Sequence, residues 1–140
     1  MKESTLWGYI REGMRGMWDA TRIESSSGNG VPDVDFGLPG KHGKIELKYI
    51  KEWPVREFTK VKLPLRPEQK LWINQRGKLS GDVWVLIRIE NSFFLLKWQQ
   101  INSACEGWTK HEWHCRAHDC WTEKIDFKQL YLSLRAGTDI

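Results

Sequence analysis

The chain has 140 residues and a formal net charge of +4, with 40% hydrophobic and 29% charged residues, the composition of an ordinary one-domain globular protein. No apolar run approaches the roughly 20 residues that span a bilayer, so a membrane partner is not expected. The amino terminus lacks the basic-then-apolar pattern of a secretory signal, which predicts an intracellular location.

The first half of the chain predicts one helix and a hairpin. Apolar residues at spacings of three and four indicate a helix over residues 3–19. The turn-rich run SSSGNG, residues 25–30, follows it. Two short strands are expected at about 31–37 and 43–50, joined by the turn LPGKHG. Residues 51–66 hold prolines with lysines between them, which predicts an irregular basic loop.

The second half predicts another helix, two strands and a final helix. Pro67 suits the first position of a helix that ends at Gly77. The run DVWVLIRIE, residues 82–90, is apolar almost throughout, which favours a strand covered on both faces. NSFFLLKW, residues 91–98, predicts the next strand, and a last helix is expected around 126–136. The fold class is therefore α/β, with about four strands.

Positive charge is concentrated in one part of the chain. Between Lys41 and Lys78 lie 11 of the 22 Lys and Arg residues and four acidic residues, a net charge of +7 against −3 for the rest. Such a segment suits a polyanion, because each phosphate contact releases counterions, although a solvated surface loop is an equally good interpretation. The candidate DNA contacts are Lys51, Arg56, Lys60, Lys62, Arg66 and Lys70.

Three charged residues, Asp33, Glu46 and Lys48, interrupt the apolar runs VPDVDF and KIELKYI, where a lone buried charge is costly. Side chains alternate faces along a strand, so Glu46 and Lys48 point the same way, and an antiparallel partner strand brings Asp33 to that face. One or two carboxylates, with substrate phosphate oxygens and waters, are typical Mg²⁺ ligands. The alternative is a solvent-facing hairpin with an ordinary Glu–Lys pair.

At these residues the chain resembles the PD-(D/E)xK nuclease superfamily. The matching residues are Pro32-Asp33 and Glu46-Leu47-Lys48. Within the superfamily, RIESSSGNGVPDV, IELKYIKEWP and LRPEQKLW are most similar to the small stand-alone nucleases of virus-type replication and repair (VRR-NUC), a branch near the archaeal-type Holliday junction resolvases. The resemblance covers about residues 3–90. It implies a restriction-endonuclease-like core, a mixed central sheet flanked by helices.

The resemblance also implies roles for individual residues. Asp33 and Glu46 would bind Mg²⁺ or Mn²⁺, with help from the main-chain carbonyl of Leu47. Lys48 would lie close to the scissile phosphate, where it can offset developing charge or orient the attacking water. Gln69 would border the site from a helix and touch metal-bound water or phosphate.

Two further carboxylates are candidates for the metal. The family has a glutamate on its first helix, which corresponds here to Glu3 or to Glu12, and the spacing to the following apolar stripe favours Glu3. Glu24 can approach the metal as well, or it can serve as a capping or turn residue before the glycine run.

The function implied by the resemblance is metal-dependent endonucleolytic cleavage of DNA, on branched substrates such as a Holliday junction or a flap, in viral or phage replication, recombination and repair. The location would be the host cytoplasm if the protein is viral. A homodimer is expected, since two sites can cut opposed strands of a junction. Two alternatives stay open: a restriction-type or nicking endonuclease on linear duplex, and a DNA-binding module without chemistry.

The chain forms one domain over residues 1–140, with a core at about 3–100 and a carboxy-terminal extension at 101–140. That extension contains CEGWTKHEWHCRAHDCW, residues 105–121, which gathers all three cysteines and three of the four histidines. A structural zinc site is one interpretation, and free thiols with surface histidines are the other, since the run lacks paired CxxC and HExxH motifs. The candidate zinc ligands are Cys105, Cys115, His118 and Cys120. The tryptophans of this run are expected in the core or an interface.

Overall fold

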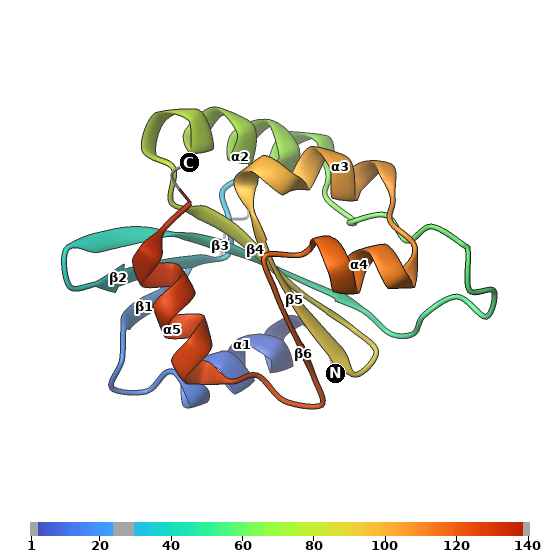
Figure 1. The fold of residues 1–140 in the computed structure, drawn as a ribbon. Coiled ribbons are helices and arrows are strands. Elements are labelled where there is room, and N and C mark those ends of the chain that lie inside the picture. Colours follow the sequence, from blue (N-terminus) through green and yellow to red (C-terminus); the bar gives the residue numbers. More distant parts are fainter. Residues whose placement is uncertain (1–2, 24–29, 139–140) are drawn as a thin grey trace.

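Six strands form one sheet in which the order in space is the order in sequence (Figure 1). The computed structural model describes residues 3–23 and 30–138. The strands are β1 (Asp19–Arg22), β2 (Val34–Leu38), β3 (Lys41–Ile50), β4 (Val83–Ile89), β5 (Ser92–Lys97) and β6 (Asp119–Thr122). The helices are α1 (Glu3–Gly13), α2 (Pro67–Ser80), α3 (Ile101–Glu106), α4 (Lys110–Arg116) and α5 (Phe127–Ala136), with a 3-10 turn at Trp98–Gln100.

The sheet is mixed because one pair of neighbours, β3 and β4, runs parallel while the other pairs run antiparallel. The α/β class, the single domain and the helix-flanked mixed sheet are confirmed. The expected number of about four strands is wrong, since β1 and β6 add one strand at each edge. None of the described helices is long and apolar enough to cross a bilayer.

The predicted hairpin is confirmed as β2 and β3, with Val34 opposite Ile45. Strand β3 begins earlier than expected because the turn tightens to Pro39 and Gly40, where glycine adopts a φ of 72°. The first helix ends at Gly13 instead of continuing to residue 19, because the chain turns there into β1.

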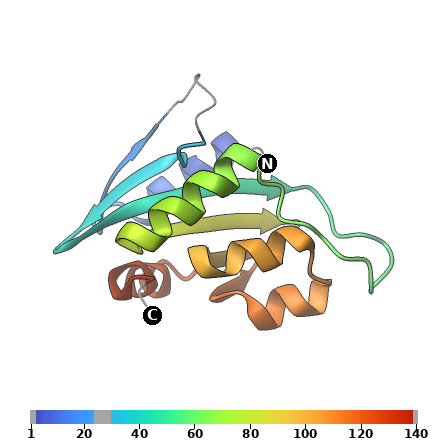
Figure 2. The same cartoon turned by 90° about the horizontal axis from the view of Figure 1, so that it is seen from above.

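Each face of the sheet carries its own hydrophobic core. Helices α1 and α5 cover one face, where Leu6 and Leu130 pack with strand residues that include Ile45 and Leu47. Helices α2, α3 and α4 cover the other face, where Ile73 and other residues of these helices pack on β4 and β5. Figure 2 shows α2, α3 and α4 side by side on this second face. Strand β4 is therefore buried on both sides, as its sequence predicted.

Helix α2 continues past Gly77, its predicted end, and stops at Gly81, whose φ is 77°. Gly77 serves packing instead: a Cβ atom there would lie 2.3 Å from the indole ring of Trp98. A glycine inside a helix costs stability, so its presence here reflects this close approach.

Residues 101–121 hold the basic loop of residues 51–66 against the sheet. Val61 exchanges two backbone hydrogen bonds with Trp108, at 2.8 and 3.1 Å, and the N–H of Leu63 donates to the carbonyl of Ala104 at 2.9 Å. Trp108 and Trp113 are 2% and 0% exposed, which confirms the expectation that they are core residues. The loop is irregular, as predicted, but firmly anchored.

Candidate functional site

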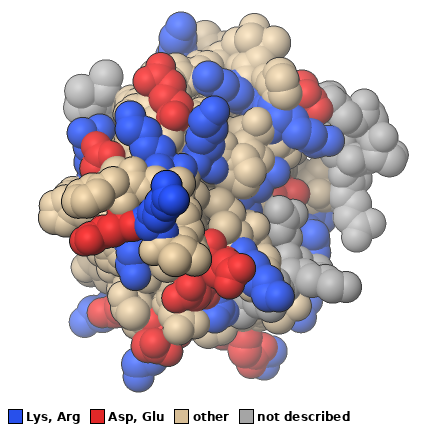
Figure 3. Space-filling model, turned by 90° about the vertical axis from the view of Figure 1, so that its right-hand side faces the viewer, with Lys and Arg blue, Asp and Glu red and all other residues tan. Residues whose placement is uncertain are grey.

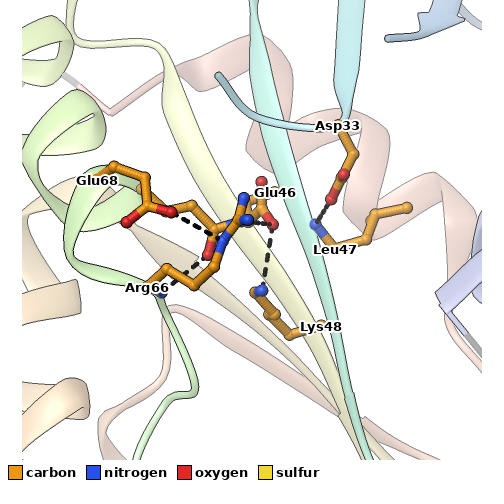
Figure 4. A network of polar contacts seen from close by, with 7 residues as sticks. Asp33, Glu46, Leu47, Lys48, Arg66 and Glu68 are labelled. Atoms are coloured by element: carbon orange, nitrogen blue, oxygen red, sulfur yellow. Dashed lines mark hydrogen bonds and ion pairs between the residues drawn. The ribbon is translucent and has the colours of Figure 1, made fainter. Parts of the chain in front are cut away.

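Strand β3 carries the centre of the site on the face that α2 covers. Ile45 and Leu47 point into the core beneath α1, so Glu46 and Lys48 point to the opposite face, which Figure 4 shows. The alternation that the sequence predicted for these four residues is thus present.

Glu46 is a buried carboxylate, with 1% of the residue exposed. Its Oε2 accepts a hydrogen bond from Nε2 of Gln69 at 2.9 Å. The ammonium nitrogen of Lys48 lies 3.5 Å from the same oxygen, and 11% of the lysine side chain is exposed. Desolvation of an ionised carboxylate costs roughly several kcal/mol. The amide of Gln69 and the ammonium of Lys48 offset much of this cost for Glu46.

Asp33 comes from the neighbouring strand, one residue before β2 begins. Its Oδ2 accepts the backbone N–H of Leu47 at 2.9 Å, so its carboxyl lies beside the peptide that joins Glu46 to Leu47. The N–H and C=O of one strand residue point to the same edge, which directs the Leu47 carbonyl toward Asp33 as well. Continuing the pairing of Val34 with Ile45 brings Pro32 opposite Leu47, and proline has no N–H to donate to that carbonyl.

The start of α2 completes this group of residues. Oε1 of Gln69 accepts the backbone N–H of Arg66 at 2.9 Å, while its Nε2 holds Glu46, so both ends of the amide are engaged. Nε of Arg66 lies 3.3 Å from Oε1 of Glu68. Gly30 approaches closely: a Cβ there would lie 2.2 Å from the carbonyl oxygen of Glu68. Gly30 ends the turn-rich run SSSGNG, and its φ of 80° is typical of the left-handed region that glycine favours.

The donor set suits a hard divalent cation. Asp33, Glu46 and the Leu47 carbonyl offer oxygen ligands at one place, and Mg²⁺ is commonly bound by one or two carboxylates with waters and substrate phosphate. Among residues 3–23 and 30–138, no group of three or more His, Cys, Asp and Glu side chains could hold a metal ion. Water, phosphate or main-chain oxygens would therefore have to complete the coordination.

The remaining candidate carboxylates are placed differently. The side chain of Glu3 and all of Glu24 lie outside the described part of the chain. Glu12 lies in α1, on the face of the sheet opposite α2, and its Oε2 pairs with Arg15 at 2.7 Å with 64% of its side chain exposed. This contact is a surface ion pair, which contributes little to stability.

The predicted DNA contacts lie around the loop that links β3 to α2. Lys51, Arg56, Lys60, Lys62 and Arg66 are exposed and Lys70 is half-buried. Figure 3 shows the side of the molecule toward which this loop projects, where Lys and Arg side chains gather with several acidic ones among them. The charge is thus available to a polyanion beside the group formed by Asp33, Glu46 and Lys48.

Within the described residues, the four candidate zinc ligands Cys105, Cys115, His118 and Cys120 are not brought together as a metal-binding group, which favours the interpretation of free thiols. Cys105 lies in α3, where burial raises the pKa of its thiol against the opposing effect of Lys70. Burial, with Asp119 nearby, also raises the pKa of the Cys120 thiol. All three cysteines are free thiols, and Sγ of Cys115 lies 3.4 Å from Nε2 of His111.

No family model and no curated protein matches this chain. Among solved structures it is similar to Hjc, a Holliday junction resolvase of the archaeal hyperthermophile Archaeoglobus fulgidus. The identity is 15% and the TM-score is 0.47, over 79% of this chain and 93% of the other. At this distance the likeness identifies neither residues nor function, and the resemblance to virus-type nucleases stays a prediction.

Proposed function

We propose that this protein is a metal-dependent nuclease that hydrolyses phosphodiester bonds of branched DNA. The observation that carries the proposal is the hydrogen bond from Leu47 to Asp33 beside the buried carboxylate of Glu46, with Lys48 on the same oxygen of Glu46 as Gln69. A carboxylate pair that served only folding would not need to be gathered where β2 begins, next to basic, exposed side chains. A cation between the carboxylates and the phosphate removes the repulsion that these charges would otherwise cause.

Each residue has a distinct part in this mechanism. Asp33, Glu46 and the Leu47 carbonyl would hold Mg²⁺ or Mn²⁺, which when bound supplies a Lewis acid and lowers the pKa of a bound water. Lys48 offsets negative charge that develops on the phosphoryl oxygens. Gln69 keeps Glu46 in one rotamer and is a positioning residue, because its amide is engaged at both ends.

The finer parts of the proposal concern the substrate and the assembly. A homodimer would bring two sites to opposed strands of a four-way junction, whereas a monomer would nick one strand or trim a flap. A place in viral or phage replication, recombination and repair belongs to the same proposal, and it rests on the motif residues alone.

The test is cleavage of end-labelled four-way junction, flap, single-stranded and linear duplex DNA, with Mg²⁺, with Mn²⁺ and with chelator. Asp33→Asn is compared with the control Asp35→Asn, which changes a carboxylate on β2 that is 51% exposed and pairs with Lys44 at 2.9 Å. We expect cleavage that requires metal, is lost in Asp33→Asn and survives in Asp35→Asn. Equal rates for wild type and Asp33→Asn would remove the proposal.

Paired symmetric cuts on the junction would support a dimeric resolvase-like enzyme. Preference for linear duplex would favour the restriction-type alternative. Tight, salt-sensitive binding without cleavage of any substrate would favour a DNA-binding module, and Asp33, Glu46 and Lys48 would then be structural residues.

A further inference from the structure

Two large apolar side chains stand fully in solvent at the tip of the basic loop. Val55 is completely exposed and Phe58 is 85% exposed. Val55 precedes, and Phe58 lies within, a turn that is closed by a hydrogen bond from the N–H of Thr59 to the carbonyl of Arg56, at 3.2 Å. Isolated exposed apolar residues are common, but a pair at the tip of a projecting loop is not explained by packing.

The base of the same loop is well anchored. Trp53, Val61 and Leu63 are 9%, 7% and 3% exposed. Nε1 of Trp113 donates to the carbonyl of Val61 at 3.1 Å. Figures 1 and 2 both show the loop extending beyond the end of the sheet. The tip is therefore presented by a fixed base.

Both ends of the loop begin at the candidate active site. The chain enters it two residues after Lys48, where β3 ends at Ile50, and leaves it at Arg66, whose backbone N–H binds Gln69. Whatever the tip contacts is thus held at a limited distance from Lys48. Ten residue steps separate Lys48 from Phe58, a span of at most about 35 Å.

The surroundings of the tip favour a nucleic acid. Residues 51–66 contain five basic and two acidic residues. Beside the tip lies a pocket of about 450 Å³ whose lining includes Val55, Lys110 and His111. Aromatic side chains next to Lys and Arg are the usual combination for binding unpaired or partly unstacked bases.

We propose that Val55 and Phe58 form an apolar wedge in which the ring of Phe58 stacks on the bases exposed at a branch point of DNA. The inference rests on the proposed function and deepens it, since it explains how branched DNA is distinguished from linear duplex. A second copy of the chain fits this tip less well. A stable interface covers about 800 Å² on each partner, whereas a fully buried aromatic side chain covers only about 150–250 Å².

The wedge also limits where the chain cuts. A span of about 35 Å corresponds to roughly ten nucleotides at 3.4 Å per step. Cleavage should therefore occur at a constant offset from the branch point, within about ten nucleotides of it.

The test compares binding of a four-way junction and of linear duplex of the same sequence by fluorescence anisotropy. The variants Phe58→Ala and Phe58→Trp are made in the Asp33→Asn protein, so that DNA is not cut. Leu79→Ala is the matched control, because Leu79 lies in α2 and is also 85% exposed. A 2-aminopurine base at the branch point reports stacking directly, and light scattering reports the oligomeric state without DNA.

We expect Phe58→Ala to reduce the preference for junction over duplex about tenfold and to abolish the 2-aminopurine response, while Phe58→Trp and Leu79→Ala keep both. An unchanged preference for junction over duplex in Phe58→Ala would overturn the wedge proposal, even if wild type cleaves junctions. A change of oligomeric state in Phe58→Ala, with equal loss of binding to both DNAs, also overturns it and makes the tip a protein interface. If wild type cuts no DNA but Phe58→Ala loses the preference, the nuclease proposal fails and the wedge stands.

Discussion

Glu46 on β3 and Val85 on β4 are neighbours in the centre of the sheet, paired in register on the face that α2 covers. Lys48 and Ile87 are the next such pair. Both Glu46 and Val85 are almost completely buried, at 1% and 0% exposure. One strand thus places charged groups where its neighbour places apolar ones.

The difference lies in what surrounds each strand. Strand β4 has β3 and β5 on its two sides, and apart from its neighbour Glu46, Val85 belongs to the apolar cluster of this face. Along β3, the partner strand β2 begins only at Val34, so Asp33 stands beside Glu46, and Gln69 and Lys48 provide polar contacts. Burial alone therefore does not determine where a carboxylate is tolerated. The hydrogen bonds and ion pairs available to it at that position do so.

The largest expected effect comes from placing a carboxylate on β4, at the position paired with Glu46. Val85→Glu should lower the free energy of unfolding by about 3–5 kcal/mol, because the new charge has no prepared contacts. Urea unfolding measures the loss, and Val85→Met, similar in length and uncharged, is the control. If Val85→Glu and Val85→Met were equally stable, β4 would tolerate a buried carboxylate as β3 does.

Removing the charge from β3 should affect cleavage much more than stability. Glu46→Gln keeps an acceptor for Gln69 but loses the charge, so we expect cleavage to fall by at least about 100-fold. The free energy of unfolding should fall by less than in Val85→Glu, since the contact with Gln69 is kept and only the ion pair with Lys48 is lost. Cleavage rates and urea unfolding are measured on the same preparation. A stable variant with full activity would exclude Glu46 as a functional residue.

A third prediction concerns the loop that follows β3, which has no counterpart after β4. Trp113→Phe removes the hydrogen bond to Val61 and some packing, at a cost of about 1–2 kcal/mol. Trypsin should then cleave within residues 51–66 about 5–30 times faster. Trp121→Phe, on the other face of the sheet, is the control. Equal cleavage of wild type and Trp113→Phe would mean that this bond does not anchor the loop.

The smallest expected effect concerns the pH dependence of stability. It comes from Glu112, a carboxylate that, unlike Glu46, serves to cap a helix. The backbone N–H of Thr109 donates to Oε1 of Glu112 at 3.0 Å and lowers the pKa of Glu112 from its ordinary value of 4.5. A lowered folded-state pKa contributes stability that is present above pH 4.5 and is lost as the pH falls through the lowered value. Thermal unfolding of wild type should therefore lose slightly more stability below pH 4.5 than that of Glu112→Gln. Parallel pH profiles of the two proteins would contradict this role.

The sequence was informative where the determining contacts are local. The tight turn at Pro39 and Gly40 sets the register of β2 and β3, so the spacing between Asp33 and Glu46 was enough to predict that they face one another across the hairpin. Alternation along β3 then placed Lys48. The family resemblance alone placed Gln69 at the border of the site, with metal-bound water or phosphate as its partner. Its hydrogen bond to Glu46 was not predicted, since it depends on the return of the chain through α2.

Elements whose stability depends on distant contacts were missed. Strand β1 has the sequence DATR, without an apolar alternation, and forms because β2 offers an edge. Strand β6 has the sequence DCWT, which is too short to show an apolar alternation and lies within the Cys/His-rich run of residues 105–121. Helix α4 did carry a local signal, the capping box of Thr109 and Glu112, which could have predicted where the helix starts.

The anchored base of the 51–66 loop has a practical meaning for protein engineering. Because Trp53, Val61 and Leu63 are packed while residues 54–60 are exposed, the tip can accept a different sequence without disturbing β3 or α2. Tips of other lengths and compositions could be grafted between these anchors, with Asp33, Glu46 and Lys48 unchanged. The chain is in this respect a scaffold with one exchangeable part.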